Sequence, residues 1–308
     1  MKLSIVIPAY NENESLPELI NRIHQVVEPI ADEYEIIVVD DGSMDGTFDT
    51  LKKLKSTYPQ LKAIRFRRNY GKSAALAEGF NRASGDIVIT MDADLQDDPA
   101  EIPNLVKKIE EGYDLVSGWK KRRHDPLSKT IPSRIFNFVT AKLTGIPLHD
   151  FNCGLKAYRN EVIKSIEVYG ELHRFLPVLA VWQGFRVTEI PVKHHPRKYG
   201  KTKFGISRFT NGFFDLLTVM FITRFRKKPL HFFGFLGLLS TFIGTAILLY
   251  LTILWFQGQG IGRRPLLFLG VLLVIVGVQF FSLGLIGEMV TSTLDQKIEY
   301  SIKEELNN

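Results

Sequence analysis

The chain has 308 residues, a formal net charge of +6 at pH 7 and a single cysteine, Cys153. One cysteine excludes a disulfide framework and a cysteine-rich metal site; we expect Cys153 to be reduced and partly buried, although a nucleophilic role stays open. No nucleic-acid motif accompanies the positive charge, which therefore favours contact with anionic lipid head groups.

Residues 1 to about 120 alternate between apolar runs and stretches of helical periodicity. The apolar runs predict short strands at 3–7, 35–39, 62–66, 87–90 and 114–117. Helical spacing after the first strand places six apolar residues on one face: Leu16, Leu19, Ile20, Ile23, Val26 and Val27. This series predicts an α/β domain with a mostly parallel sheet flanked by helices. Ligands are expected at the carboxyl ends of the strands, near a switch in strand order.

Two carboxylates and an amide follow the strand expected at 87–90. Residues two apart in an extended chain project to one side, so Asp92, Asp94 and Gln96 offer oxygen ligands together. Mg²⁺ or Mn²⁺ held by one or two carboxylates completes its shell with water and substrate phosphates. The alternative is that the aspartates cap the helix whose start Asp98 marks.

A second acidic pair, Asp40 and Asp41, closes the strand at 35–39 and lies at the same expected edge. Gly71-Lys72-Ser73 resembles the end of a phosphate-binding loop, but Phe66 replaces the required glycine and no G-x-G-x-x-G follows the first strand. Phosphate-loop ATPases and Rossmann-type dinucleotide enzymes are therefore excluded. Lys72 is either a cation facing this edge or a solvated lysine.

Two long segments near the C-terminus, 229–256 and 265–287, contain no Asp, Glu, Lys or Arg. Each exceeds the ~20 residues that cross a bilayer as a helix, which favours two transmembrane spans over two buried helices. The short loop 257–264 joins them, so both flanks lie on the same side. Four cations between 224 and 228 outnumber the two arginines of the loop, and no signal peptide precedes the first strand. We therefore expect an integral membrane protein with its head and both termini in the cytoplasm.

Several short stretches carry a resemblance to a known family. They are IVIPAYNE at 5–12, VVDDGS at 38–43 and MDADLQDDP at 91–99. In order and spacing these resemble the signature of family-2 glycosyltransferases with a GT-A fold. The stretch DFNCGLK at 150–156 and the hairpin resemble the polyprenyl-phosphate glycosyltransferases of the dolichol-phosphate mannose synthase and bactoprenol glucosyltransferase type. The resemblance covers nearly the whole chain.

The resemblance implies a donor site for a UDP- or GDP-sugar. The residues implied to contact the nucleotide are Pro8, Tyr10, Glu12, Asp40, Asp41, Lys72 and Asp92. Asp92, Asp94 and Gln96 would hold Mg²⁺ or Mn²⁺ against the diphosphate, whose developing charge needs a Lewis acid and nearby cations. The implied acceptor, a polyprenyl phosphate, is already anionic and needs no strong base.

Residues 190–214 contain many cations and no acid, and they predict the acceptor site. The segment resembles the family's R-x-x-G-x-[ST]-K loop at four positions: Arg197, Gly200, Thr202 and Lys203. Arginine recognises phosphate through fixed paired donors, so we expect Arg197 and Lys203 to act on the lipid phosphate. A generic lipid-facing basic patch is the alternative.

Two amphipathic segments, 133–143 and 209–222, predict helices that lie along the membrane interface. Arg134 on the first is expected to reach the lipid phosphate and act in catalysis, unless it only snorkels. Asp150 and Lys156 are expected to join the acceptor site, with a structural ion pair as the alternative for Asp150.

These patterns predict four parts. They are a cytoplasmic GT-A catalytic domain at 1–206, an interface helix with a basic segment at 207–228, a transmembrane hairpin at 229–287 and a cytoplasmic helix at 288–308. The resemblance implies inverting transfer of a sugar from a nucleotide diphosphate to undecaprenyl or dolichyl phosphate. It also makes a homo-oligomer possible, since relatives assemble through membrane segments, but the sequence leaves the oligomeric state open. Transfer to another lipid or a growing glycan, or a non-catalytic scaffold or lipid-translocation partner, are the alternatives.

Overall fold

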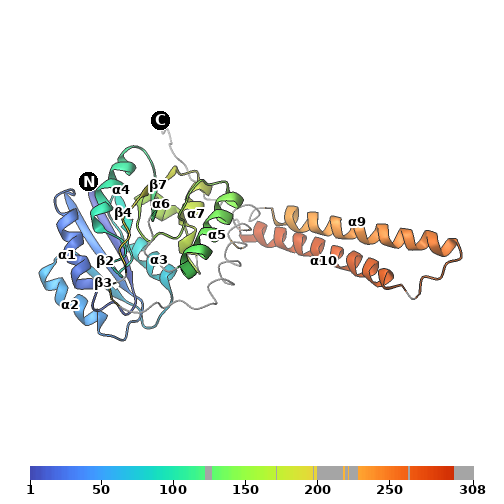
Figure 1. Ribbon diagram of the computed structural model, residues 1–308, viewed down its shortest axis with the longest axis horizontal. Coiled ribbons are helices and arrows are strands. Elements are labelled where there is room, and N and C mark those ends of the chain that lie inside the picture. Colours follow the sequence, from blue (N-terminus) through green and yellow to red (C-terminus); the bar gives the residue numbers. More distant parts are fainter. Residues whose placement is uncertain are drawn as a thin grey trace. The chain divides into compact units, whose positions relative to one another are not determined.

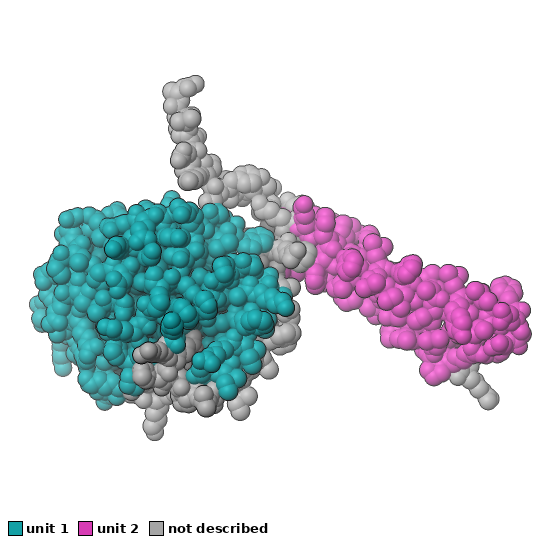
Figure 2. All heavy atoms as spheres, turned by 45° about the horizontal axis from the view of Figure 1, so that its top comes forward, with its two compact units in different colours: residues 1–219 teal, residues 220–308 magenta. Residues whose placement is uncertain are grey.

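The computed structural model describes residues 1–121, 127–170, 172–196, 198–199, 218, 221, 228–262 and 264–294. The chain divides into two compact units, Met1–Val219 and Met220–Asn308 (Figure 2). The first unit contains the sheet and its flanking helices, and the second contains two long apolar helices.

The first unit is built on a seven-stranded sheet (Figure 1). Its strands are β1 Lys2–Ala9, β2 Glu33–Asp40, β3 Leu61–Arg65, β4 Ile87–Thr90, β5 Leu115–Trp119, β6 Lys156–Arg159 and β7 Val187–Pro191. They lie in the order β3-β2-β1-β4-β6-β5-β7, and only β6 runs antiparallel to its neighbours. The α/β fold with a mostly parallel sheet is confirmed. All five predicted strands are present, whereas β6 and β7 had not been predicted.

Helices cover both faces of the sheet. In the first unit they are α1 Leu16–Val27, α2 Thr47–Thr57, α3 Lys72–Arg82, α4 Ile102–Glu110, α5 Leu127–Thr144, α6 Asn160–Ser165 and α7 Leu176–Trp182. Two short 3-10 helices are η1 Pro99–Glu101 and η2 Leu172–Arg174. Buried side chains of α1, α2 and α4 share one core with the sheet, and those of α3, α6 and α7 share the other. Because both faces are covered, β1, β2 and β4 read as nearly continuous apolar runs.

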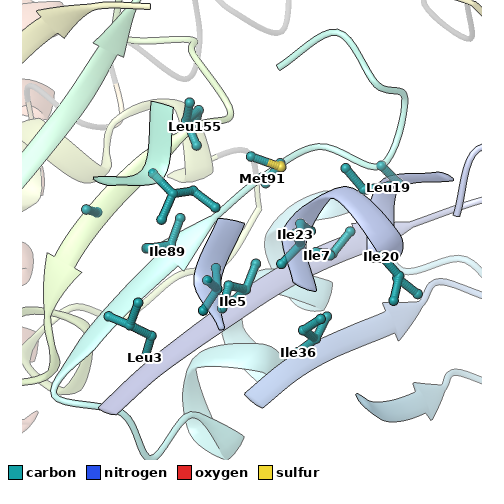
Figure 3. Close-up of a cluster of buried hydrophobic side chains, with 14 of the residues drawn as sticks. Leu3, Ile5, Ile7, Leu19, Ile20, Ile23, Ile36, Ile89, Met91 and Leu155 are labelled. Atoms are coloured by element: carbon teal, nitrogen blue, oxygen red, sulfur yellow. The ribbon is translucent and has the colours of Figure 1, made fainter. Parts of the chain in front are cut away.

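The predicted apolar face of α1 packs into the larger core (Figure 3). Its fully buried members are Leu16, Leu19, Ile20, Ile23 and Val27, while Val26 is only partly buried. Burial of each such side chain contributes about 1.5–3 kcal/mol. This packing holds the loop between β1 and α1, residues 10–15, at the carboxyl edge of the sheet.

Helix α5 has an unusual distribution of side chains. Ile135 and Phe138 are 60% and 67% exposed, whereas Asn137 and Thr140 are buried. Phe136 instead packs within a small core of residues from the loop before β6 and from η2 and α7. The predicted amphipathic segment 133–143 therefore lies on a helix with an apolar face open to its surroundings. The second such segment, 209–222, falls almost wholly outside the described residues.

The second unit is a hairpin of α9 Pro229–Phe256 and α10 Pro265–Leu294, both long and apolar enough to cross a membrane. Small residues let the two helices approach closely: a Cβ on Gly277 would lie 2.7 Å from the carbonyl oxygen of Gly237. The Ser240 hydroxyl also donates to the Leu273 carbonyl at 2.8 Å. Such contacts are typical of helix association in lipid. Helix α10 continues past residue 287, the expected end of the second span.

Candidate active site

The site lies where several strands end at one edge of the sheet. The last residues of β1 and β2, Ala9 and Asp40, are register partners. Because β6 is antiparallel, it begins where its neighbours end, and Lys156 pairs with Thr90 of β4 and Ser117 of β5. The antiparallel strand therefore brings the segment 150–156 to the edge that carries the acidic pairs.

A small cavity that opens to solvent lies at this edge. Its lining includes four residues that the sequence had singled out: Pro8, Lys72, Asp92 and Lys156. The other lining residues are Leu76, Thr90, Met91, Asn152, Cys153, Gly154, Tyr158, His173 and Leu176. Side chains from β1, α3, β4, β6 and η2 thus meet around one carboxylate.

Asp92 is the acidic group of this cavity. The Lys72 ammonium, on the first residue of α3, pairs with Asp92 Oδ1. Burial opposes ionisation of Asp92, but the positive charges of Lys72 and Lys120 outweigh it and lower the pKa of Asp92 to about 2. Gly154 lies directly behind the carboxylate, because a Cβ on this residue would lie 2.6 Å from Asp92 Cγ.

Lys156 places a second cation in the cavity. Its side chain is buried, and its ammonium donates to the Cys153 carbonyl. Burial lowers the pKa of Lys156. Nearby, Asn152 Oδ1 is buried and has no hydrogen-bond partner in the structure as described. The cavity therefore offers a lysine and an amide oxygen for a ligand or water.

A buried ion pair supports the floor of the site. Lys120, just after β5, lies 2.7 Å from Asp97 Oδ1. Burial lowers the pKa of Lys120, but the attraction of Asp97 outweighs this and the net shift is upward. Burial also raises the pKa of the Cys153 thiol to about 12. Cys153 is therefore a neutral thiol near pH 7, which argues against a nucleophilic role.

The acidic turn after β4 differs from its predicted geometry. β4 ends at Thr90, so residues 92–96 are not extended, and Leu95 adopts a positive φ of 60°. The strand ends at Thr90 as predicted, but the expectation that the residues after it are extended is wrong, because the Gln96 N–H donates to Asp94 Oδ1 at 3.2 Å and closes a tight turn. Asp92, Asp94 and Gln96 are nevertheless all partly exposed.

The residue that caps the helix after this turn is Asp98, and not Asp92 or Asp94 as the alternative had it. Asp98 Oδ1 accepts the Ala100 N–H at 3.1 Å at the start of η1. Gln96 instead contacts the strand-like segment after β7, where the His195 N–H donates to the Gln96 carbonyl at 2.8 Å. Asp92 and Asp94 therefore remain candidates for ligand binding.

The donor set at the turn fits a hard divalent cation shared with a substrate. Within the residues that the structure describes, no three His, Cys, Asp or Glu side chains gather into a complete metal cage. Asp92 and Asp94 provide carboxylate oxygens and Gln96 an amide oxygen, the ligand chemistry of Mg²⁺ and Mn²⁺. Such an ion keeps open positions for water and phosphate oxygens.

Asp40 and Asp41 organise the loops beside the cavity. Asp40 is buried; its Oδ1 accepts the Ser43 N–H at 2.9 Å, and its Oδ2 lies 3.5 Å from Arg65 Nε. Asp41 accepts the N–H groups of Tyr70 and Gly71 at 2.7 and 2.9 Å. Burial raises the pKa of Asp41. Both acids thus fix backbone turns, and Asp41 fixes the one that leads to Lys72.

The loop after β1 is tied to the loop after β2. The Asn11 N–H donates to Ser43 Oγ at 2.8 Å, and the Glu12 N–H donates to Thr47 Oγ1 at 3.0 Å. Asn11 has a φ of 52°, which reverses the chain at the end of the strand. Tyr10 and Glu12 remain partly exposed at the edge of the sheet.

The predicted acceptor residues are only partly described. Arg134 is exposed on α5, and Asp150 is buried in the loop before β6. Asp150 Oδ1 accepts the Asn152 N–H at 3.2 Å. Arg197 and Lys203, with the rest of the R-x-x-G-x-[ST]-K loop from 200 on, lie outside the described residues.

Several residues of the site carried no predicted role, among them Lys120, Asn152, Gly154 and His173. Lys120 directly follows β5, which ends two residues later than the predicted strand at 114–117, so the rule that located the acidic pairs applies to it too. His173 comes from η2, and its Nδ1 lies 2.9 Å from Ser73 Oγ, one hundred residues earlier in the chain. No local pattern in the sequence signals that contact.

The chain is similar to known proteins in sequence and in fold. The sequence profile of Glycosyl transferase family 2 matches residues 4–167. Dodecaprenyl-phosphate galacturonate synthase of Rhizobium johnstonii is 40% identical over 299 residues, covering 95% of this chain and 88% of that protein.

Solved structures share the fold at lower identity. Glucosyl-3-phosphoglycerate synthase of Mycobacterium tuberculosis, in complex with phosphoglyceric acid, superimposes with a TM-score of 0.55 at 20% identity, over 72% of this chain and 79% of that one. The complex of that enzyme with Mn²⁺, UDP-glucose and phosphoglyceric acid gives a TM-score of 0.55 at 19% identity, with the same coverage. The fold is that of a GT-A glycosyltransferase. The chain belongs to glycosyl transferase family 2.

Proposed function

We propose that the chain transfers a sugar from a nucleotide-diphosphate sugar to the phosphate of a polyprenyl lipid, with inversion at the anomeric carbon. One observation carries the proposal: the cavity at the sheet edge brings Asp92 together with Lys72 and Lys156 in a chain that also has two helices long enough to span a membrane. The 40% identical relative, whose name joins galacturonate to dodecaprenyl phosphate, supports it. Galacturonate is accordingly one candidate sugar.

In the proposed reaction, an oxygen of the lipid phosphate forms a bond with the anomeric carbon. The bond from that carbon to the diphosphate oxygen breaks, and its electron pair leaves with the nucleoside diphosphate. Asp92, Asp94 and Gln96 would hold Mg²⁺ or Mn²⁺, which supplies Lewis-acid stabilisation of the leaving group. Because the attacking phosphate is already anionic, no side chain needs to remove a proton from it.

The chain's own cations divide the remaining tasks in this proposal. Lys72 neutralises the donor diphosphate. Arg134, Lys156, Arg197 and Lys203 hold the acceptor phosphate, and Asp150 orients that group. The nucleotide lies over the carboxyl ends of β1 and β2 and the loops that follow them, which carry Pro8, Tyr10, Glu12, Asp40 and Asp41. Fixed charges of this kind stabilise developing charge without reorganisation during the reaction.

The proposed placement puts the catalytic head and both termini in the cytoplasm and the hairpin of α9 and α10 in the bilayer. The parts are a head at 1–206, an interface and basic segment at 207–228, the hairpin from 229, and a C-terminal segment. The exposed apolar face of α5 would rest on the lipid surface. A lipid phosphate would then meet the cavity at the height of the bilayer.

The test is a panel of radiolabelled UDP- and GDP-sugars incubated with membranes that contain the protein and undecaprenyl or dolichyl phosphate. We expect one donor to label the polyprenyl phosphate in the presence of Mg²⁺ or Mn²⁺. Label in another lipid or in a growing glycan would replace the proposed acceptor. The absence of turnover with every donor would favour a scaffold or lipid-translocation partner.

A further inference from the structure

Lys72 is the counter-ion of Asp92 in the structure. Its ammonium pairs with Asp92 Oδ1, and each side chain is 31% exposed. One oxygen of the candidate metal ligand is thus already paired with a protein cation.

The surroundings leave the Lys72 side chain as the part that can move. Gly154 backs the carboxylate so closely that a Cβ there would lie 2.6 Å from Asp92 Cγ. The backbone before Lys72 is held as well, because Asp41 accepts the Gly71 N–H at 2.9 Å. A lysine side chain has four carbon atoms beyond Cα and rotates freely where it reaches solvent.

The other lysines near Asp92 have partners of their own. Lys120 is held by the buried carboxylate of Asp97 at 2.7 Å, and Lys156 donates to the Cys153 carbonyl. Both are buried more deeply than Lys72. Of these three lysines, Lys72 is the one that is paired with Asp92. Its side chain can therefore leave Asp92 without a change in the core.

We propose that Lys72 occupies Asp92 when no donor is bound, and that a divalent cation and a nucleoside diphosphate displace it together. The inference rests on the proposed function, in which Asp92 is a metal ligand. A metal ion alone must compete with the ammonium for the same oxygen and enter beside its positive charge. A diphosphate gives the released ammonium a new anionic partner. By linkage, each ligand then raises the affinity for the other by the same factor.

The experiment measures Mn²⁺ binding to the full-length chain in detergent micelles, from the free Mn²⁺ signal in electron paramagnetic resonance. Titrations are run alone and with saturating UDP, and again with GDP. We expect the nucleotide that binds to tighten Mn²⁺ binding at least fivefold, the lower end of the typical range of about 5–150-fold. In Lys72→Met, Mn²⁺ should bind at least fivefold more tightly without nucleotide, so the coupling should be smaller than in wild type by about the same factor. The coupling that remains comes from direct contact of the ion with the diphosphate.

Three further variants sharpen the result. Lys72→Arg keeps the charge and should retain wild-type coupling, whereas Lys72→Gln should repeat the effect of Lys72→Met. Lys52→Met removes an exposed lysine that pairs with Asp49 on α2, and it should change neither affinity. Equal Mn²⁺ affinity of wild type and Lys72→Met without nucleotide overturns the inference, and so does an arginine variant that behaves like the methionine one.

Asp92→Asn separates this inference from the proposed function. If that variant binds Mn²⁺ as tightly as wild type with nucleotide present, Asp92 is not a ligand and the metal assignment itself fails. If Asp92→Asn loses Mn²⁺ while Lys72→Met stays at the wild-type affinity, the metal assignment stands and only the role of Lys72 is wrong.

Discussion

The position of the Asp92 carboxylate depends on Gly154, a neighbour that has no side chain. Gly154→Ala would place a Cβ 2.6 Å from Asp92 Cγ, so the carboxylate or the 153–155 backbone must shift. Overpacking of this kind costs about 1–3 kcal/mol, and we expect transfer to fall roughly ten- to a hundredfold. Initial rates with saturating donor measure the effect.

The matched control for this substitution is Gly260→Ala, because a Cβ at Gly260 meets nothing within 4 Å. Both variants should melt within a few degrees of wild type. A Gly154→Ala protein with the wild-type rate would mean that Asp92 can move without consequence.

Asp94 tests the metal assignment at constant shape. Asp94→Asn removes one carboxylate charge from the acidic turn, and loss of transition-state stabilisation of this type costs about 10²-fold or more in rate. Transfer should be measured over a range of Mg²⁺ and Mn²⁺ concentrations. Asp49→Asn on the exposed surface of α2 is the control, with no expected loss. Normal turnover by a folded Asp94→Asn protein would exclude Asp94 as a ligand.

At the residue scale, the sequence located the acidic edge but not its details. Asp40 and Asp92 could be placed together because parallel strands end at a common edge. The tight turn at Leu95 could not be foreseen, since it depends on a hydrogen bond that the Gln96 N–H donates to Asp94 Oδ1. His173 joins the site through tertiary contacts alone, which no local periodicity encodes.

Helix α5 is the element whose role is most directly tested by substitution. Exchange of Ile135 and Phe138 for serine removes two apolar side chains that are more than half exposed. Transfer of each side chain from water to lipid contributes about 1 kcal/mol or more of favourable free energy. We therefore expect the Michaelis constant for membrane-embedded polyprenyl phosphate to rise roughly tenfold or more, while that for a short, soluble prenyl phosphate stays the same.

Tyr169→Ser, which removes another exposed large side chain from the first unit, is the control. A similar loss with both acceptors would show that α5 serves the cavity and not the lipid surface.

Strand β6 shows why not every strand could be predicted from the sequence. Its sequence, KAYR, contains no apolar run, and it is held by pairing on both sides with β4 and β5. The five strands that were predicted have stronger signals of their own. When the conformation of a short strand depends on pairing with its neighbours, its own sequence carries little signal for a strand.

At the scale of the whole molecule, the donor and acceptor functions should separate. A chain ending at residue 228 keeps every described residue of the cavity, so it should bind sugar nucleotide with metal. It should transfer poorly to long-chain lipid in vesicles, because proximity of bound reactants can contribute about 7 kcal/mol or more to lowering a barrier. A soluble short-chain prenyl phosphate should restore transfer at least in part.

Isothermal titration with the donor and initial rates with both acceptors measure the two functions. The full-length chain in the same detergent is the control. If the severed head glycosylates vesicle-bound lipid as fast as the intact chain, the hairpin serves only as an anchor or an assembly element.

The exposed face of α5 also has a consequence during synthesis. Phe138 leaves the ribosome roughly ninety residues before Pro229, the start of the first long apolar helix, and at about 5–20 residues per second this takes roughly 5–20 s. For that time the nascent head presents an apolar stripe to water with no bilayer attached to its own chain. Overproduction in excess of membrane insertion should therefore yield aggregates or chaperone-bound heads, and serine at Ile135 and Phe138 would relieve this at the expense of lipid docking.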